Sequence, residues 1–176
     1  RRMTTALLII DVQANLFDAP KAYRIDAVAA LLDRLAIRAR AAGWPVIFVQ
    51  HEEDGCEWQR GTPGWAFHTA LSPRDGDIVV AKRHCDAFWD TPLAETLSRL
   101  GVDRLVIGGY ASDYCVDTTL RAAASRGLAV TVVADGHTTS DRAHLDAAAI
   151  VRHHAAIWST FEASVRVVNS EGIDIQ

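Results

Sequence analysis

The sequence predicts an α/β protein in which helices cover both faces of a parallel β-sheet in three layers. Six short runs of apolar, partly β-branched residues recur along its 176 residues, and helical patterns separate most of them. This alternation is typical of βαβ units with right-handed crossovers. No internal repeat or low-complexity linker interrupts it, so we expect a single domain over residues 1–176.

Each expected strand is a run that is short for a helix and apolar enough to be buried on both faces. The first is Leu7-Leu8-Ile9-Ile10, in which every residue is Leu or Ile. Parallel strands with helices on both sides show such continuous apolar runs instead of an alternating pattern. The other five expected strands lie at residues 46–49, 78–80, 105–107, 130–133 and 165–168.

The expected helices are bounded by ordinary start and stop residues. Gly43, Gly101 and Gly127 end the first three, since glycine readily adopts the left-handed conformation that closes a helix. Thr91-Pro92 begins the second, and Ser140 is the expected cap of the fourth. The four helices are expected at residues 24–42, 92–100, 115–126 and 141–157.

Composition and charge exclude several classes of function. With 49% hydrophobic and 23% charged residues, the chain has the balance of a globular protein. A net charge of −4 and no cluster of Lys or Arg argue against nucleic acid as a partner. No apolar run approaches the roughly 20 residues that span a bilayer. Three irregularly spaced cysteines make no disulfide framework, and Asp11 breaks the first apolar run too early for a signal peptide, so a cytoplasmic location is expected.

Polar residues that could take part in catalysis or binding follow several of the expected strands. In open parallel sheets, ligands bind beyond the carboxyl ends of the strands. Asp11 directly follows the first strand, His51 lies just beyond the second and Lys82 just beyond the third, and Cys115 lies a few residues after the fourth. The sequence therefore predicts an acid, a cation and a thiol at one edge of the sheet.

These three groups together suit acyl transfer. We expect Cys115 in the first turn of its helix, where the helix dipole and a nearby Lys82 ammonium lower a thiol pKa. Asp11 could accept the thiol proton and return it to a departing amine, and the Gly108-Gly109 pair would let the chain turn tightly so that N–H groups face an oxyanion. From the residues alone an alternative stays open, in which Cys115 is a small buried core residue, Asp11 a turn residue and Lys82 solvated.

Four stretches carry a resemblance to a known family. They are "ALLIIDVQANLF", "VAKRHCDAFWDTPL", "LVIGGYASDYCVDTTLRAAASRG" and "VVADGHTT", and they stand in order over nearly the whole chain. At these residues the sequence resembles the isochorismatase-like cysteine hydrolase superfamily. The resemblance implies a catalytic triad of Asp11, Lys82 and Cys115, an oxyanion hole from the N–H groups of Ala111 and Cys115, and a cis peptide between Tyr110 and Ala111. It also implies the strand order 3-2-1-4-5-6.

The resemblance further implies a type of reaction. Because Cys115 is present, we expect a cysteine hydrolase that cleaves a C–N bond of a small amide, carbamoyl or lactam substrate through a thioester. The alternatives are cleavage of a vinyl ether, as in the isochorismate-cleaving branch, and a non-catalytic oligomeric binding protein. The family commonly assembles, so a homo-oligomer, dimer or tetramer, is expected.

No metal and no other cofactor is expected. Nicotinamidases of this family begin their metal site with Asp-x-His after the second strand, whereas this chain has Gln50-His51-Glu52 there. His51 and its acidic neighbours could hold a cation, but a polar pocket wall is the preferred interpretation. We expect only a small-molecule substrate, and neither nucleic acid nor a membrane as partner.

Further side chains are candidates for the pocket. Loop aromatics near the expected site either line the pocket or bury a contact between subunits. The candidate pocket residues are Gln13, Phe17, His51, Trp65, Tyr110 and Tyr114.

Other residues are expected to have structural roles. Cys85 is interpreted as structural, Asp113 as the N-cap of the cysteine helix and His137 as a cap of the following helix. The adjacent His153 and His154 diverge by about 100° on a helix, and so are expected in packing or an interface and not on one metal.

Overall fold

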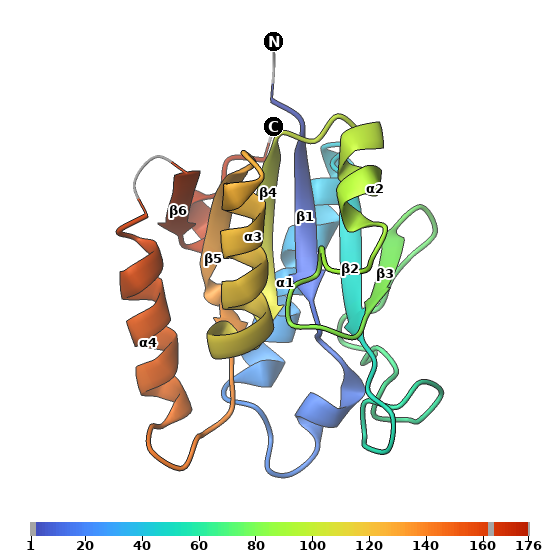
Figure 1. Cartoon of the computed structure of the whole chain (residues 1–176), viewed down its shortest axis with the longest axis vertical. Coiled ribbons are helices and arrows are strands. Elements are labelled where there is room, and N and C mark those ends of the chain that lie inside the picture. Colours follow the sequence, from blue (N-terminus) through green and yellow to red (C-terminus); the bar gives the residue numbers. More distant parts are fainter. Residues whose placement is uncertain (1–2, 162–163, 176) are drawn as a thin grey trace.

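A computed structural model describes residues 3–161 and 164–175, and its centre is a six-stranded sheet with helices on both faces (Figure 1). All neighbouring strands pair in parallel, in the order β3-β2-β1-β4-β5-β6, which confirms the expected topology. The strands are β1 (Thr5–Ile10), β2 (Val46–His51), β3 (Ile78–Lys82), β4 (Arg104–Tyr110), β5 (Ala129–Thr138) and β6 (Val165–Val168).

Four of the strands, β2, β3, β4 and β5, are longer at their carboxyl ends than the apolar runs predict. β2 continues to His51 and β3 to Lys82, and these two residues are register partners in the sheet. β5 continues to Thr138, so it includes His137. The polar ends of the strands therefore lie inside the hydrogen-bonded sheet, which fixes their positions more firmly than a loop would.

The helices agree with the expected ones except at two points. They are α1 (Ile25–Ala41), α2 (Leu93–Arg99), α3 (Asp117–Ser125) and α4 (Ala147–Trp158). α4 begins six residues later than expected, because Asp146 and not Ser140 caps it by accepting a hydrogen bond from Ala149 N at 2.7 Å. α3 begins two residues after Cys115, since a π-helical turn, η2 (Ser112–Val116), precedes it.

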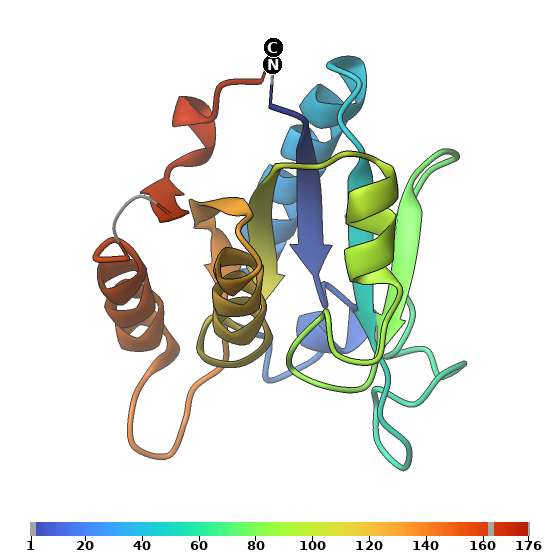
Figure 2. The same ribbon diagram turned by 45° about the horizontal axis from the view of Figure 1, so that its top comes forward.

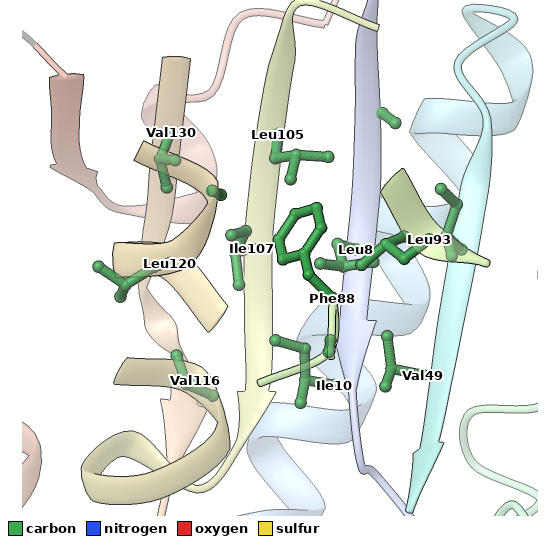
Figure 3. Packing of buried hydrophobic residues seen from close by; sticks show 14 of the residues in the cluster. Leu8, Ile10, Val49, Phe88, Leu93, Leu105, Ile107, Val116, Leu120 and Val130 are labelled. Atoms are coloured by element: carbon green, nitrogen blue, oxygen red, sulfur yellow. The ribbon is translucent and has the colours of Figure 1, made fainter. Parts of the chain in front are cut away.

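Two hydrophobic clusters hold the layers together. α1 covers one face of the sheet, packing Leu32 and Leu35 against side chains such as Phe48. α2 and α3 cover the opposite face, and α4 stands beside α3 there (Figures 1 and 2). Figure 3 shows this second cluster, in which Phe88 from the loop before α2 and Leu120 of α3 lie over the sheet. Both faces of the central strands are therefore buried from solvent, as their apolar runs predict.

The glycine pair before the expected site has a different role from the one predicted. Gly108 and Gly109 lie inside β4 and do not form a turn. Gly109 has φ of +124°, and a Cβ there would lie 2.1 Å from the carbonyl oxygen of Ile10. Glycine is required because β1 and β4 approach closely at this point, and the turn itself begins after Tyr110.

Within the described residues, no helix is both long and apolar enough to cross a bilayer.

Candidate active site

The acid, the cation and the thiol meet at the carboxyl edge of the sheet. Lys82 Nζ lies 2.8 Å from Asp11 Oδ2 and 3.3 Å from Cys115 Sγ. The side chains of Lys82 and Asp11 are 0% and 2% exposed. The expected convergence of the three groups is observed, although they come from the ends of β1 and β3 and from η2, which are far apart in sequence.

The charges in this cluster compensate one another. Burial alone would lower the pKa of the Lys82 ammonium, but the neighbouring Asp11 and Cys115 raise it above the ordinary lysine value. Lys82 is therefore a fixed cation that neutralises the buried Asp11 carboxylate. The second carboxylate oxygen, Asp11 Oδ1, is buried and has no hydrogen bond of normal geometry within the described part of the chain.

The expectation of a lowered thiol pKa is wrong. Burial and the negative charge of Asp11 raise the pKa of Cys115 far above the usual thiol range, and the lowering effect of Lys82 does not compensate. Sequence reasoning counted Lys82 and the helix start but not the desolvation of the sulfur or the carboxylate beside it. In the resting site Cys115 is a thiol next to an ion pair whose charges already cancel.

His51 completes the polar floor of the site. Its Nδ1 lies 3.1 Å from Lys82 Nζ, and its Nε2 lies 3.8 Å from Glu53 Oε2. Burial and the Lys82 charge lower the pKa of His51, so the ring is neutral near pH 7. A neutral ring that accepts from the ammonium through Nδ1 carries its proton on Nε2, facing Glu53.

The segment between β4 and α3 presents Cys115 from a tightly held turn. The peptide between Tyr110 and Ala111 is cis, as the family resemblance implies. The Ala111 carbonyl accepts hydrogen bonds from the N–H groups of Tyr114 and Val116, each at 3.0 Å. Ser112 Oγ lies 2.8 Å from His137 Nδ1, which ties the turn to β5.

His137 is therefore a buried strand residue and not a helix cap. Its ring packs against Trp158 with the ring centroids 4.9 Å apart, and burial lowers its pKa to about 4.

A cavity of about 380 Å³ opens above these groups. Three of the predicted pocket residues, His51, Tyr110 and Tyr114, line it together with Asp11, Ala111 and Cys115. It is completed by Glu53, Trp58, Cys85 and Arg142.

Of these last four, only Trp58 carried a signal in the sequence, as an aromatic residue in the long loop after β2. Glu53 and Arg142 were missed because charged residues in loops are common and carry no pattern. Cys85 is exposed and lines the pocket, so its interpretation as structural is wrong.

The remaining pocket candidates lie elsewhere. Gln13 is fully buried, and its Nε2 donates to the carbonyls of His51 at 3.0 Å and Trp65 at 2.7 Å, while its Oε1 accepts from His51 N at 2.8 Å. Phe17 stacks on His68 with the ring centroids 3.6 Å apart. Gln13 thus fixes the end of β2 to the long loop, and Gln13, Phe17 and Trp65 do not line the cavity.

Asp113 forms a salt bridge instead of capping a helix. Its carboxylate accepts from Arg142 Nε at 2.8 Å and from Arg142 Nη2 at 3.1 Å, and also from Thr139 Oγ1 at 2.6 Å. The Arg142 guanidinium lies 4.8 Å from the ring centroid of Tyr114. This pairing holds the loop before α4 against the pocket.

His153, His154 and Cys56 lie outside the catalytic cavity. His153 is exposed on α4, and His154 Nδ1 lies 2.9 Å from the Ile150 carbonyl oxygen. The Cys56 thiol lies 3.4 Å from the Glu53 carbonyl oxygen. Across residues 3–161 and 164–175, no group of three His, Cys, Asp or Glu side chains is arranged to hold a metal ion.

Two curated relatives share much of this sequence. The chain is 39% identical over 142 residues to streptothricin hydrolase from Streptomyces noursei, an alignment that covers 80% of this chain and 56% of that protein. It is 32% identical over 171 residues to ureidoacrylate amidohydrolase RutB from Methylobacterium radiotolerans, which covers 75% of this chain and 66% of that protein. The chain thus spans somewhat more than half the length of the first of these relatives.

The similarity extends to the whole fold. The crystal structure of an isochorismatase from Pseudomonas putida superimposes with a TM-score of 0.91 at 32% identity, covering 97% of this chain and 90% of that one. The family model described as the isochorismatase domain matches residues 5–162, which include β1 to α4 and every residue of the cavity. The chain belongs to the isochorismatase family.

Proposed function

We propose that this protein is a cysteine hydrolase that cleaves a C–N bond of a small amide, carbamoyl or lactam compound. The observation that carries the proposal is the contact of Lys82 with both Asp11 and Cys115 at the floor of a cavity. A thiol, a carboxylate and an ammonium in contact provide a nucleophile, a proton acceptor and a fixed counter-charge.

The raised thiol pKa defines the first step. A free thiolate would place a second negative charge next to Asp11, which the buried site disfavours. Transfer of the thiol proton to Asp11 as sulfur attacks the carbonyl keeps the total charge constant, because the carboxylate becomes neutral. Lys82 then pairs with the developing charge on Cys115.

The later steps return the proton. The N–H groups of Ala111 and Cys115 stabilise the tetrahedral oxyanion. Asp11 protonates the amine as the C–N bond breaks, which leaves a thioester on Cys115. Water then attacks the thioester, Asp11 takes a proton from it, and the proton passes to the sulfur as the acid leaves.

Two further observations support this reaction class. Relatives at 39% and 32% identity are a streptothricin hydrolase and a ureidoacrylate amidohydrolase. A cavity of about 380 Å³ is near the lower end of the size of small-molecule sites, which favours a compact substrate.

A screen of small amides, carbamates and lactams for release of ammonia or amine tests the proposal. Turnover by the wild-type protein and its loss in Cys115→Ala would support it. Turnover of none of these classes by wild-type protein would contradict it.

Vinyl ether cleavage is the second candidate, because Asp11 lines the cavity and its buried Oδ1 has no hydrogen-bond partner among the described residues, so that in its protonated form it could donate to an ether oxygen. In that case Cys115→Ala retains most activity toward the ether, and Asp11→Asn loses it.

A further inference from the structure

A second cavity adjoins the candidate active site. Its volume is also about 380 Å³, and both cavities are lined by Trp58 and Tyr110. The rings of these two residues stack with their centroids 6.2 Å apart and their planes 25° apart. A stacked aromatic pair is therefore the common wall of the two cavities.

The charges of the catalytic cavity do not cancel completely. Asp11 and Lys82 neutralise each other, and so do Arg142 and Asp113. Glu53 remains, and among the described residues its ion-pair partner is His51 at 3.8 Å, whose lowered pKa keeps the ring neutral near pH 7. The cavity is thus left with one uncompensated negative charge at its wall.

The second cavity has the same sign of charge. Asp18 and Glu57 line it, and none of its described lining residues is Lys or Arg. Among the described residues no Lys or Arg forms an ion pair with Asp18, Glu53 or Glu57. All three carboxylates are exposed at the cavities, where a ligand can reach them.

This arrangement distinguishes between classes of substrate. An aromatic face attracts an ammonium or guanidinium group through its quadrupole, and a nearby carboxylate adds an attraction between opposite charges. An anionic substrate would be repelled by the same groups, and Arg142, the cation among the described lining residues, is already bound by Asp113. A neutral substrate would gain apolar contact with the rings but no electrostatic attraction.

We infer that the substrate carries an ammonium or guanidinium group, which binds against the Trp58–Tyr110 pair and the carboxylates of Glu57 and Asp18 while the scissile carbonyl lies at Cys115. The inference rests on the proposed function for the position of the carbonyl. Trp58, Tyr110, Glu57 and Asp18 are then specificity residues and take no part in the bond-breaking steps.

Three amides of nearly equal size test the inference by binding alone. They are 6-aminohexanamide, which is cationic, heptanamide, which is neutral, and adipamic acid, which is anionic. Calorimetric titration into Cys115→Ser at low salt requires no turnover. We expect the cationic amide to bind about tenfold more tightly than heptanamide, or ~1.4 kcal/mol. Equal or tighter binding of the neutral or anionic amide would overturn the inference.

Substitution of a residue that lines the second cavity tests whether the cationic group binds there. Glu57→Gln should weaken the binding of the cationic amide several-fold and leave the binding of heptanamide unchanged. Glu171 is exposed and lies outside both cavities, so Glu171→Gln should change the affinity for neither amide. If Glu57→Gln weakens the binding of both amides equally, Glu57 does not distinguish a cationic from a neutral ligand, which contradicts the inference. Because binding is measured without turnover, preference for the cation can hold or fail independently of whether any amide is hydrolysed.

Discussion

Lys82 Nζ lies 3.3 Å from Cys115 Sγ, and the pKa of that thiol is nonetheless raised. The ammonium is already engaged by Asp11 at 2.8 Å, and burial penalises the thiolate. The resting site therefore keeps sulfur protonated, and the carboxylate both suppresses the free thiolate and accepts its proton during attack. Because the three residues act differently on the sulfur, substitution of each one is expected to have a different measurable effect.

Removal of the nucleophile should abolish turnover. Cys115→Ala is expected to lower kcat for an amide substrate by a factor on the order of 10³ or more, because no thioester can form. Wild-type protein mixed with substrate should show the acyl adduct by intact mass spectrometry. Cys85→Ala is the matched control in the same cavity and should retain the adduct and most activity. An adduct that disappears only in Cys85→Ala would assign the nucleophile to Cys85.

Removal of the Asp11 charge should make the Cys115 thiol more reactive toward alkylation and yet abolish amide turnover. In Asp11→Asn the remaining neighbour of the sulfur is Lys82, so the pKa of Cys115 should fall. A fall of one unit speeds iodoacetamide alkylation at neutral pH about tenfold, while amide turnover is lost because the proton acceptor is gone. Rates are measured in a Cys56→Ser, Cys85→Ser background. Slower alkylation in Asp11→Asn than in its parent would show that Asp11 does not suppress the thiolate.

Loss of the buried cation should cost stability. Lys82→Met leaves the Asp11 carboxylate buried without its partner, and this is expected to lower the free energy of unfolding by about 3–5 kcal/mol. Urea denaturation measures the change. The double variant Lys82→Met, Asp11→Asn should recover much of the loss, because no unpaired charge remains. No recovery in the double variant would indicate that lost packing, and not the charge, causes the effect.

His137 should make stability depend on pH. Its pKa is lowered to about 4 in the folded protein from an ordinary 6.5, so the unfolded chain binds the extra proton between these values. The contribution of the neutral ring is therefore complete above about pH 6.5 and is lost as the pH falls toward 4, by about 3 kcal/mol in all.

The urea midpoint of wild type and His137→Gln, measured from pH 7 to 4, checks this dependence. The difference between the two proteins should shrink as the pH falls, since glutamine binds no proton. The exposed His153→Gln should run parallel to wild type. A constant difference between wild type and His137→Gln would mean that His137 does not titrate between folded and unfolded states in this range.

The sequence by itself determined the layered α/β class and the order of its elements. Runs such as Leu7-Leu8-Ile9-Ile10 are apolar throughout and become buried on both faces when they pair as strands in a sheet. The alternation of such runs with helical patterns is therefore enough to predict the class and the order of the elements. The rule that ligands bind at the carboxyl ends of parallel strands directed attention to Asp11, Lys82 and Cys115. The strand order and the cis peptide came from the family resemblance.

Tertiary structure decided what depends on the surroundings of each side chain. The direction of the Cys115 pKa shift follows from burial beside Asp11, residues that are more than one hundred positions apart in the chain. Gln13 lies outside the cavity because its side chain is bonded to the backbone of His51 and Trp65, which belong to other segments of the chain. A role for Glu53 and Glu57 follows only from the cavities that they line, since a charged loop residue has no sequence pattern that shows which charges neighbour it.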